Sequence, residues 1–393
     1  MPTSRELPAL TTEARPVLDP SPLRELRASA PVCRVHTPAG DEAWLVTRHA
    51  EVKKLLHDER LGRSHPSPET APRYVKNSLL DLLVADDPQV AREAHARTRA
   101  LFTPNFSAKR IRALRPRIEE LASDLVEDFA ARERPVDLHA YFSSPFSLRI
   151  LCELIGVPDE DRERCAALLA GMGQIDTGQS VVTGPKALFG LLAGVSARKR
   201  AEPGDDVISR MCEAGIPDDH AGSLAAVLLF AGLESVATHI DLGVVLLSAH
   251  PEQRGAVLRD PALLTGTVEE VLRSAKRAGA TLPRYASEDI EIAGVTIHAG
   301  ELVLLDFALA NFDEQAFSEP ELFDVTRSPN QHLTFGHGIW HCVGAPLARV
   351  ELSTAFTTLF SRLPGLRPAV PLDELRTRGG ELVGGLAELP VTW

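Results

Sequence analysis

Residues 335–344 have the sequence Phe-Gly-His-Gly-Ile-Trp-His-Cys-Val-Gly, and an apolar run with helical spacing, residues 345–360, follows at once. We therefore expect Cys342 just before the first turn of a helix. Unpaired backbone N–H groups and the helix dipole favour a thiolate there. Gly338 and Gly344 leave room where the backbone turns tightly. A lone cysteine is more often a small buried residue, but this setting suits a thiolate that binds a metal.

The composition is that of a globular protein, and it excludes several classes. The chain has 393 residues, 44% of them hydrophobic, and we expect one domain, 1–393. The net charge of −12 argues against general nucleic-acid binding, which needs a basic face. The five cysteines form no CxxC pair, and the first 20 residues contain no apolar segment typical of a secretion signal. We expect a protein of the reducing cytoplasm, without a membrane anchor.

Apolar periodicity predicts a mainly α fold with smaller β-rich regions. Helices are expected at 51–57, 90–101, 111–131, 144–155, 160–172, 184–201, 252–259, 264–276 and 345–362. Strands are expected at 32–46, around a turn at 38–41, and at 290–305 and 382–393. Residues 307–341 show no period, and a long irregular segment inside a compact domain is usually functional.

The most apolar stretch, 221–249, is interrupted by polar residues at its middle. Its uninterrupted runs are shorter than the ~18 residues of a membrane span, so we expect a long helix buried in the core. Glu234 and Ser235 lie in this stretch, although an acid and a hydroxyl in an apolar helix are costly without partners. One interpretation is a serine bonded to its own helix and a glutamate that reaches the surface. The other is a pair that delivers protons.

The spacing Phe-x-x-Gly-x-x-x-Cys-x-Gly and the continuation Ala-Pro-Leu-Ala-Arg at 345–349 resemble the heme-binding loop of the cytochrome P-450 family. The resemblance runs over most of the chain. It implies heme b between the long central helix and the helix after the loop, with Cys342 as the iron ligand. The residues implied to surround the heme are Phe335, Gly336, Trp340, Gly344, Ala231 and Gly232. Phe335 would shield the sulfur.

Glu270 and Arg273 match the family's E-x-x-R motif, 72 residues before Cys342. Alone, such a pair usually lies on a solvated helix face. In the family it is buried and holds the irregular segment, usually with a third, basic member. Here Leu322 stands where arginine is frequent, so Arg327 is the candidate for that part. Phe312 also replaces a frequent arginine.

His95 and Arg99, four residues apart on one helix face, resemble the family's propionate-binding residues, and Arg284 resembles its other anchor. Each residue alone would more often be a solvated surface group. Trp340 stands where the family usually has a histidine or arginine and brings an N–H donor but no charge. Either His337 or His341 is expected to compensate.

The resemblance implies a monooxygenase that takes O2 as co-substrate. Protons would pass through water held by Ser235 and Glu234, where serine replaces the more frequent threonine. The implied substrate is a hydrophobic small molecule such as a polyketide, macrolide or terpenoid of bacterial secondary metabolism, which is hydroxylated or epoxidised. The expected substrate-lining residues are Val227, Ala231, Ala280, Leu382 and Val383.

Since the chain contains no flavin or iron–sulfur motif, electrons from NAD(P)H are expected through separate proteins, an iron–sulfur ferredoxin and its reductase. A basic cluster could dock the ferredoxin, with solvated charge as the alternative: Arg92, Arg97, Lys109, Arg110 and Arg112. A monomer is expected. Two rival functions stay open, a heme-binding sensor or activator without turnover and an oxygenase driven by hydrogen peroxide.

Overall fold

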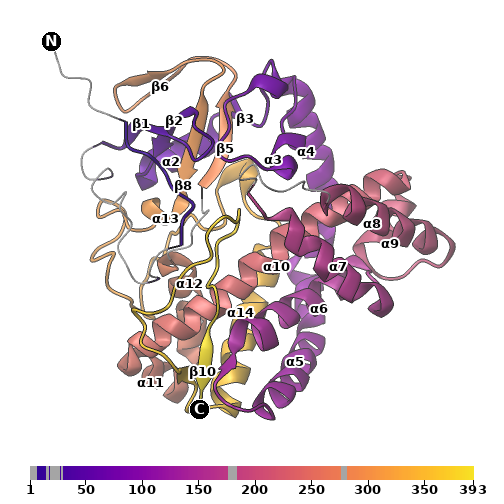
Figure 1. Ribbon diagram of the computed structural model, residues 1–393, viewed down its shortest axis with the longest axis vertical. Coiled ribbons are helices and arrows are strands. Elements are labelled where there is room, and N and C mark those ends of the chain that lie inside the picture. Colours follow the sequence, from indigo (N-terminus) through magenta and orange to yellow (C-terminus); the bar gives the residue numbers. More distant parts are fainter. Residues whose placement is uncertain (1–6, 15–16, 18–26, 28–29, 176–183, 276–280) are drawn as a thin grey trace.

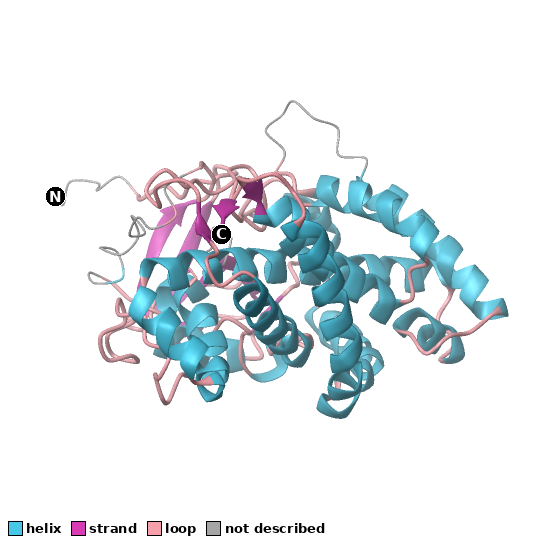
Figure 2. Cartoon of the chain, turned by 90° about the horizontal axis from the view of Figure 1, so that it is seen from below, coloured by secondary structure: helices cyan, strands magenta, loops and turns pink. Residues whose placement is uncertain are grey.

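The computed structural model describes residues 7–14, 17, 27, 30–175, 184–275 and 281–393. Most strands gather at one end of the molecule, a short C-terminal strand lies at the other end, and helices form most of the rest (Figures 1 and 2). The helices are α2 (His49–His57), α3 (Ser78–Leu82), α4 (Pro88–Phe102), α5 (Ala108–Ala130), α6 (Ser144–Ile155), α7 (Asp159–Met172), α8 (Gly184–Ala201), α9 (Val207–Glu213), α10 (Asp218–Ala249), α11 (Pro251–Arg259), α12 (Leu264–Ser274), α13 (Phe307–Ala310) and α14 (Ala345–Arg362). A π-helical turn, His139–Ser143, leads into α6.

The long apolar helix α10 crosses the middle of the molecule (Figure 1). It packs against α6, α8 and α14 and buries side chains around its circumference. Among the described residues, α10 alone is long and apolar enough to span a membrane, but a helix that is apolar all round is equally suited to the core of a large protein. The prediction of a long core helix is confirmed, and the helix begins at Asp218, three residues before the predicted start.

The main sheet has five strands in the order β1 (Val32–His36), β2 (Glu42–Val46), β8 (Leu302–Asp306), β5 (Thr281–Ala286) and β3 (Leu61–Gly62). Only β2 and β8 pair in parallel. A second sheet orders β4 (Val136–Asp137), β10 (Pro390–Thr392) and β9 (Arg367–Pro368), and β6 (Ile290–Ile292) pairs with β7 (Val295–Ile297). Helix α2, the main five-stranded sheet and the β6–β7 pair enclose a separate apolar core that includes Val52, Leu55 and Leu305.

Most predicted elements are confirmed, and the differences have simple causes. Helices 144–155, 184–201 and 345–362 have the predicted ends. The strand predicted at 382–393 is wrong except at Pro390–Thr392, where the backbone finds partners in β4 and β9. The short helices α3 and α9 were not predicted, because five to seven residues show too little periodicity.

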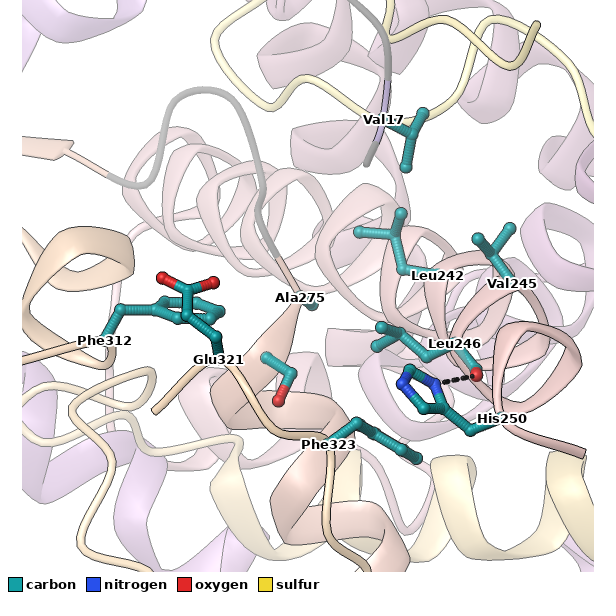
Figure 3. A pocket seen from close by; sticks show the side chains of 10 residues that line it. Val17, Leu242, Val245, Leu246, His250, Ala275, Phe312, Glu321 and Phe323 are labelled. Atoms are coloured by element: carbon teal, nitrogen blue, oxygen red, sulfur yellow. Dashed lines mark hydrogen bonds between the residues drawn. The ribbon is translucent and has the colours of Figure 1, made fainter. Parts of the chain in front are cut away.

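A pocket of about 130 Å³ lies beside the C-terminal part of α10 (Figure 3). Leu242, Leu246 and Phe323 line it, and His250 Nδ1 lies 2.9 Å from Leu246 O. Its lining is mostly apolar and shares no residue with the cavity at Cys342 described next.

Candidate functional site

The loop before α14 forms a tight turn that presents Cys342. The Cys342 N–H donates to Phe335 O at 2.7 Å and closes the loop. Gly336 and Gly338 have φ angles of 69° and 60°, a left-handed conformation that glycine adopts without strain. A Cβ atom at Gly338 would also lie 3.1 Å from Nδ1 of His57 in α2. The predicted turn is confirmed at Gly338.

Gly344 differs from Gly338 in its backbone. Its φ of −78° suits any residue, and a Cβ atom there would lie 3.7 Å from Cys342 Sγ, an ordinary contact. The expectation that the missing side chain leaves room at this turn stays a prediction. Gly344 precedes the first turn of α14, and its N–H and that of Ala345 donate to the Cys342 sulfur.

Cys342 is open to a cavity and enclosed by protein on its other sides. This enclosure raises the pKa of the thiol, while the N–H groups of Gly344 and Ala345 and the charges of Arg99 and Arg349 lower it. The donors predicted from the helix start are present, but burial outweighs them for the free thiol. A coordinated metal ion deprotonates a thiol outright, so the loop suits a metal-binding thiolate.

The cavity at Cys342 has a volume of about 300 Å³ and lies between the loop, α10 and α14. From α10 it is bordered by Ala231, Gly232 and Ser235, and from the loop by Phe335, Gly336, Trp340 and Gly344, all of which were predicted. The remaining border is mostly apolar: Phe106, Leu151, Leu228, Val236, Leu272, Phe307, Leu347 and Leu352. Gly232 also allows close packing of helices, since a Cβ atom there would lie 2.9 Å from Leu151 Cδ1 of α6.

The predicted substrate-lining residues divide between sites. Ala231 borders the Cys342 cavity. Val227 packs into the core, and Leu228 borders the cavity instead, because successive residues of a helix point about 100° apart. Ala280 lies outside the described residues.

The prediction that Leu382 and Val383 line the same space is wrong. Val383 borders a second cavity, of about 220 Å³, together with Glu234; we call it the Glu234 cavity. The Leu382 N–H donates to Gly173 O at 2.8 Å, which holds this segment against the end of α7.

Glu234 and Ser235 face different sides of α10. Ser235 borders the Cys342 cavity, and its Oγ donates to Ala231 O at 2.7 Å. Glu234 borders the Glu234 cavity and forms an ion pair with Arg378. Burial raises the pKa of the Glu234 carboxyl. The serine therefore bonds to its own helix, and the two side chains border different cavities. Their joint role in proton delivery stays a prediction.

Three cationic or titratable side chains contact the Trp340 ring, and a fourth binds the next residue, His341; we call His95, Arg284, Arg63 and Arg99 the cation cluster. The ring centroids of His95 and Trp340 are 4.4 Å apart. The guanidinium carbons of Arg284 and Arg63 lie 4.6 and 5.4 Å from the Trp340 ring centroid. Arg99 donates to His341 O at 2.9 Å and so ties α4 to the Cys342 loop.

The cation cluster is strongly positive. Burial and the charges of Arg63, Arg99 and Arg284 lower the pKa of His95 to about 4. Arg284 is buried, burial lowers its pKa well below the ordinary value, and its Nε has no hydrogen-bond partner. Among the described residues, no carboxylate offsets the positive charge of Arg63 or Arg284. A bound group with two carboxylates would satisfy these donors.

Arg63 brings a positive charge to the Trp340 ring and was not predicted from the sequence. His337 packs on His57, with ring centroids 4.6 Å apart, and His341 packs on Phe335 at 6.2 Å. Arg63 follows the two-residue strand β3 and carries no motif, so nothing in the sequence connected it to Trp340.

The Glu270–Arg273 pair is buried, as the resemblance implied. Arg273 donates from Nε and Nη2 to the two Glu270 carboxylate oxygens at 2.9 and 2.7 Å, and both side chains are fully buried. Arg327 completes the network, with Nε 3.2 Å from Glu270 Oε2. This contact confirms the prediction that Arg327 supplies the third, basic member of the network in place of an arginine at position 322.

The two departures near this network are accommodated locally. Leu322 is exposed, but its carbonyl accepts hydrogen bonds from Arg273 at 3.2 Å and Arg327 at 2.9 Å. The Arg273 guanidinium lies 5.2 Å from the Phe312 ring centroid, a cation–π contact. The network thereby holds the irregular segment that leads to Cys342.

Glu269, adjacent to this pair, links α12 to α14. Arg349 Nε donates to it at 2.6 Å, and His332 Nε2 lies 3.1 Å from the same carboxylate. These contacts outweigh burial and lower the pKa of Glu269 to about 2. The Arg349 guanidinium also lies 4.6 Å from the Phe335 ring centroid. Arg349 therefore supports Phe335 beside the sulfur.

Three further polar residues border the Cys342 cavity and were not predicted: Glu351, His239 and Thr334. Burial raises the pKa of Glu351 in α14 to about 8, and its Oε2 has no hydrogen-bond partner. His239 lies one turn after Ser235 and places Nδ1 2.6 Å from Ser235 O. Glu351 lies within the run at 345–362 that was assigned to a helix on apolar spacing alone, which concealed it.

Two of the five members of the predicted basic cluster, Arg110 and Arg97, pair with acids of the chain. Arg110 pairs with Asp205 at 2.8 Å, and its side chain is only 15% exposed. Arg97 lies 3.6 Å from Glu93. Lys109 and Arg112 are exposed on α5.

Comparisons with known proteins agree with this geometry. A family model described as cytochrome P-450 matches residues 205–364. The chain is 39% identical over 398 residues to pentalenolactone synthase of Streptomyces exfoliatus, covering 99% of this chain and 100% of that protein. It is 40% identical over 382 residues to mycinamicin IV hydroxylase/epoxidase of Micromonospora griseorubida, covering 94% of each.

A solved structure of a polyene macrolide antibiotic pimaricin epoxidase is 52% identical and superposes with a TM-score of 0.90. That match covers 99% of this chain and 100% of the epoxidase. Structures of the mixed-function enzyme that binds mycinamicins superpose at 0.85, with 38% identity. Both structural matches cover 99% of this chain.

Proposed function

The chain belongs to the cytochrome P-450 family and is a monooxygenase, and we propose that it epoxidises or hydroxylates a macrolide in bacterial secondary metabolism. The observation that supports this most strongly is the Cys342 cavity, where a thiol from the loop and a hydroxyl from α10, Ser235, border one mostly apolar space. Two relatives whose names state epoxidation or hydroxylation act on macrolides, the pimaricin epoxidase and the mycinamicin enzyme.

The residues of the site fit heme b. Cys342 would ligate the iron, and the cation cluster would hold the propionates, with Arg284 and Arg63 supplying donors that lack a carboxylate partner among the described residues. Once bound, a thiolate-ligated heme activates O2 with two electrons and two protons and transfers one oxygen atom to substrate. Phe335 and Trp340 would limit access of water to this space from the loop side.

The chain's own part in the chemistry is to position substrate and move protons. Leu228, Val236 and Ala231 would orient an apolar substrate on the α10 side of the cavity. Ser235 would hold a proton-bearing water at its Oγ, because a hydroxyl that donates to Ala231 O can still accept. Glu234, on the other side of α10, would supply the proton from the Glu234 cavity after turning away from Arg378.

Electrons would come from NAD(P)H through a separate iron–sulfur ferredoxin and its reductase. Lys109 and Arg112, both exposed on α5, are the members of the basic cluster that support docking of an acidic partner. The double change Lys109→Glu, Arg112→Glu should weaken ferredoxin binding at low salt. We further propose one domain over 1–393, a monomer, and a cytoplasmic location.

The substrate is tested by titrating the heme-loaded ferric protein with a polyene macrolide that still carries the alkene. Saturable displacement of iron-bound water, measured as a spin-state shift, is expected, with epoxide formed once electrons are supplied. The same titration and turnover assay with a macrolide that lacks the alkene, over the same concentration range, tests for hydroxylation. If only small terpenoids or strongly ionic compounds shift the spectrum, the macrolide proposal is wrong.

A further inference from the structure

A buried charge cluster lies on the side of α10 away from Cys342. Asp241 is fully buried and accepts a hydrogen bond from Ser143 Oγ at 2.5 Å. His139 Nδ1 lies 2.7 Å from the other Asp241 oxygen. Glu234 lies about two turns before Asp241 on α10, and its Oε1 lies 3.8 Å from His139 Nε2. Arg378 pairs with Glu234 and also approaches His139.

The backbone before α6 is shaped to make this contact. Residues His139–Ser143 form a single π-helical turn. Side chains four apart lie near one face of this turn, and both His139 and Ser143 reach Asp241. Single π turns occur frequently at functional sites.

Asp241 determines how His139 can act. A carboxylate at Nδ1 holds a proton on that nitrogen and leaves Nε2 to change its state. Nε2 lies 3.4 Å from Arg378 Nη2 and 3.8 Å from Glu234 Oε1. A neutral imidazole would accept from Arg378, whereas an imidazolium would donate toward Glu234. One nitrogen can thus exchange Arg378 for Glu234 as its partner.

The Glu234 cavity connects this group to water. It is lined by His139, Glu234, Arg378, Gln174 and Glu381, besides apolar residues. The side chains of Glu234 and Arg378 are 20% and 25% exposed, so solvent reaches both. Ser235, the adjacent residue, borders the Cys342 cavity. The cluster therefore lies between solvent and the α10 turn that borders the reaction space.

We propose that His139 is a proton-holding and positioning residue that reloads Glu234 from the Glu234 cavity; this rests on the proposed role of Glu234 in proton delivery. The proton on Nε2 passes to Glu234 Oε1, and the neutral imidazole keeps its Nδ1 proton on Asp241. Nε2 then accepts from Arg378 until it takes a proton from water in the cavity. Each cycle moves one proton and leaves His139 as it began.

The charges around His139 agree with this assignment. Burial lowers the pKa of His139, but the hydrogen bond that its Nδ1–H donates to Asp241 and the charges of Asp241 and Glu234 outweigh burial and Arg378, so the pKa is raised. Burial raises the pKa of Glu234. The other acids nearby are Asp137, which accepts from the His139 N–H at 3.0 Å, and Glu381, 3.6 Å from Arg378.

The test compares His139→Gln with Ser143→Ala in the heme-loaded full-length protein. Ser143→Ala also removes a contact to Asp241 but leaves His139 in place. Hydrogen peroxide released per NAD(P)H consumed is measured from about pH 6 to about pH 9, with a plant-type ferredoxin and its reductase as electron donors. Glu234→Gln is measured in parallel.

We expect His139→Gln to raise peroxide per NAD(P)H by roughly threefold or more and to flatten its pH dependence. The effect should be smaller than the loss of a general acid itself, because His139 only resupplies Glu234 with protons. Ser143→Ala should follow wild type. If Glu234→Gln raises peroxide but His139→Gln matches wild type at every pH, the role of His139 is wrong and that of Glu234 survives. If neither variant differs from wild type, both roles fail.

A second variant keeps the test informative if His139→Gln does not fold. Should His139→Gln fail to retain heme, the double change His139→Gln, Asp241→Asn removes two opposite charges together and avoids an unpaired buried carboxylate. The expected rise in peroxide and loss of pH dependence are the same. A double variant with the wild-type profile would overturn the inference.

Discussion

Arg327 Nε lies 3.2 Å from Glu270 Oε2, although the two residues are 57 positions apart and the family pattern places an arginine elsewhere in this segment. The same guanidinium donates to Ser318 O at 2.7 Å and Leu322 O at 2.9 Å. One side chain therefore both balances a fully buried carboxylate and holds the irregular segment. Its replacement should affect the fold around Cys342 as a whole.

Changing Arg327 to Leu should destabilise the protein by about 3–5 kcal/mol, because it leaves Glu270 with one fewer cation in a buried site. Denaturant unfolding and heme content of the purified protein measure this. Arg115→Leu is the control, since Arg115 lies 3.7 Å from Glu119 on an exposed helix face and should cost under about 0.5 kcal/mol. Equal stability of the two variants would contradict the network.

The cation cluster predicts how firmly heme is held. Arg63→Gln and Arg284→Gln should each speed the transfer of heme to an apo-globin acceptor by about 10- to 100-fold, the worth of one charge-assisted hydrogen bond to a carboxylate. Adding Trp340→His to Arg63→Gln should slow heme transfer part of the way back to the wild-type rate. Unchanged transfer by Arg63→Gln would show that Arg63 does not face a propionate.

Glu269 gives a pH dependence with a definite sign. Its pKa in the fold is about 2 against an ordinary 4.5, so the unfolded chain binds its proton first as pH falls. The stabilisation is complete above pH 4.5 and is lost as pH falls toward about 2. Glu269→Gln should lower the free energy of unfolding by about 1–3 kcal/mol at neutral pH, a figure reduced for partial exposure.

The check on Glu269 is the difference in unfolding free energy between variant and wild type at about pH 7 and about pH 3. The difference should shrink at the lower pH. Glu119→Gln, at an exposed carboxylate, should show little difference at either pH. A difference for Glu269→Gln that grows on acidification would reverse the predicted sign.

The proton route predicts uncoupling. The double change Glu234→Ala, Ser235→Ala should raise the electrons consumed per product severalfold, since each group serves proton transfer. Peroxide-driven turnover should stay largely intact, because peroxide brings the oxygen already reduced and protonated. Loss of both activities together would favour a structural role, and absence of turnover in wild type would favour the non-catalytic sensor.

The sequence was sufficient for elements whose pattern is local. The helix at 345–362 follows from apolar spacing, and the loop before it from glycine, proline and aromatic composition. The strand at 382–393 was overpredicted because Leu382 and Val383 are apolar and suit a strand, whereas pairing depends on β4 and β9, which are distant in sequence.

The site was predictable where a motif exists and not where contacts are long-range. Cys342, Glu270 and Arg273 are identified by spacing. Arg63 reaches Trp340 only through the folding of β3 against β5, and no spacing rule connects them. The opposite orientation of Glu234 and Ser235 could have been expected, since adjacent helical residues point about 100° apart.

The most direct test of the account is the visible spectrum of the reduced, carbon monoxide-treated protein. With Cys342 as the iron ligand, the Soret band should be strongly shifted to the red. Cys342→His should move it to the position typical of histidine-ligated heme. A wild-type band already at that position, or purified protein that binds no heme, would contradict the assignment of Cys342 as the thiolate ligand.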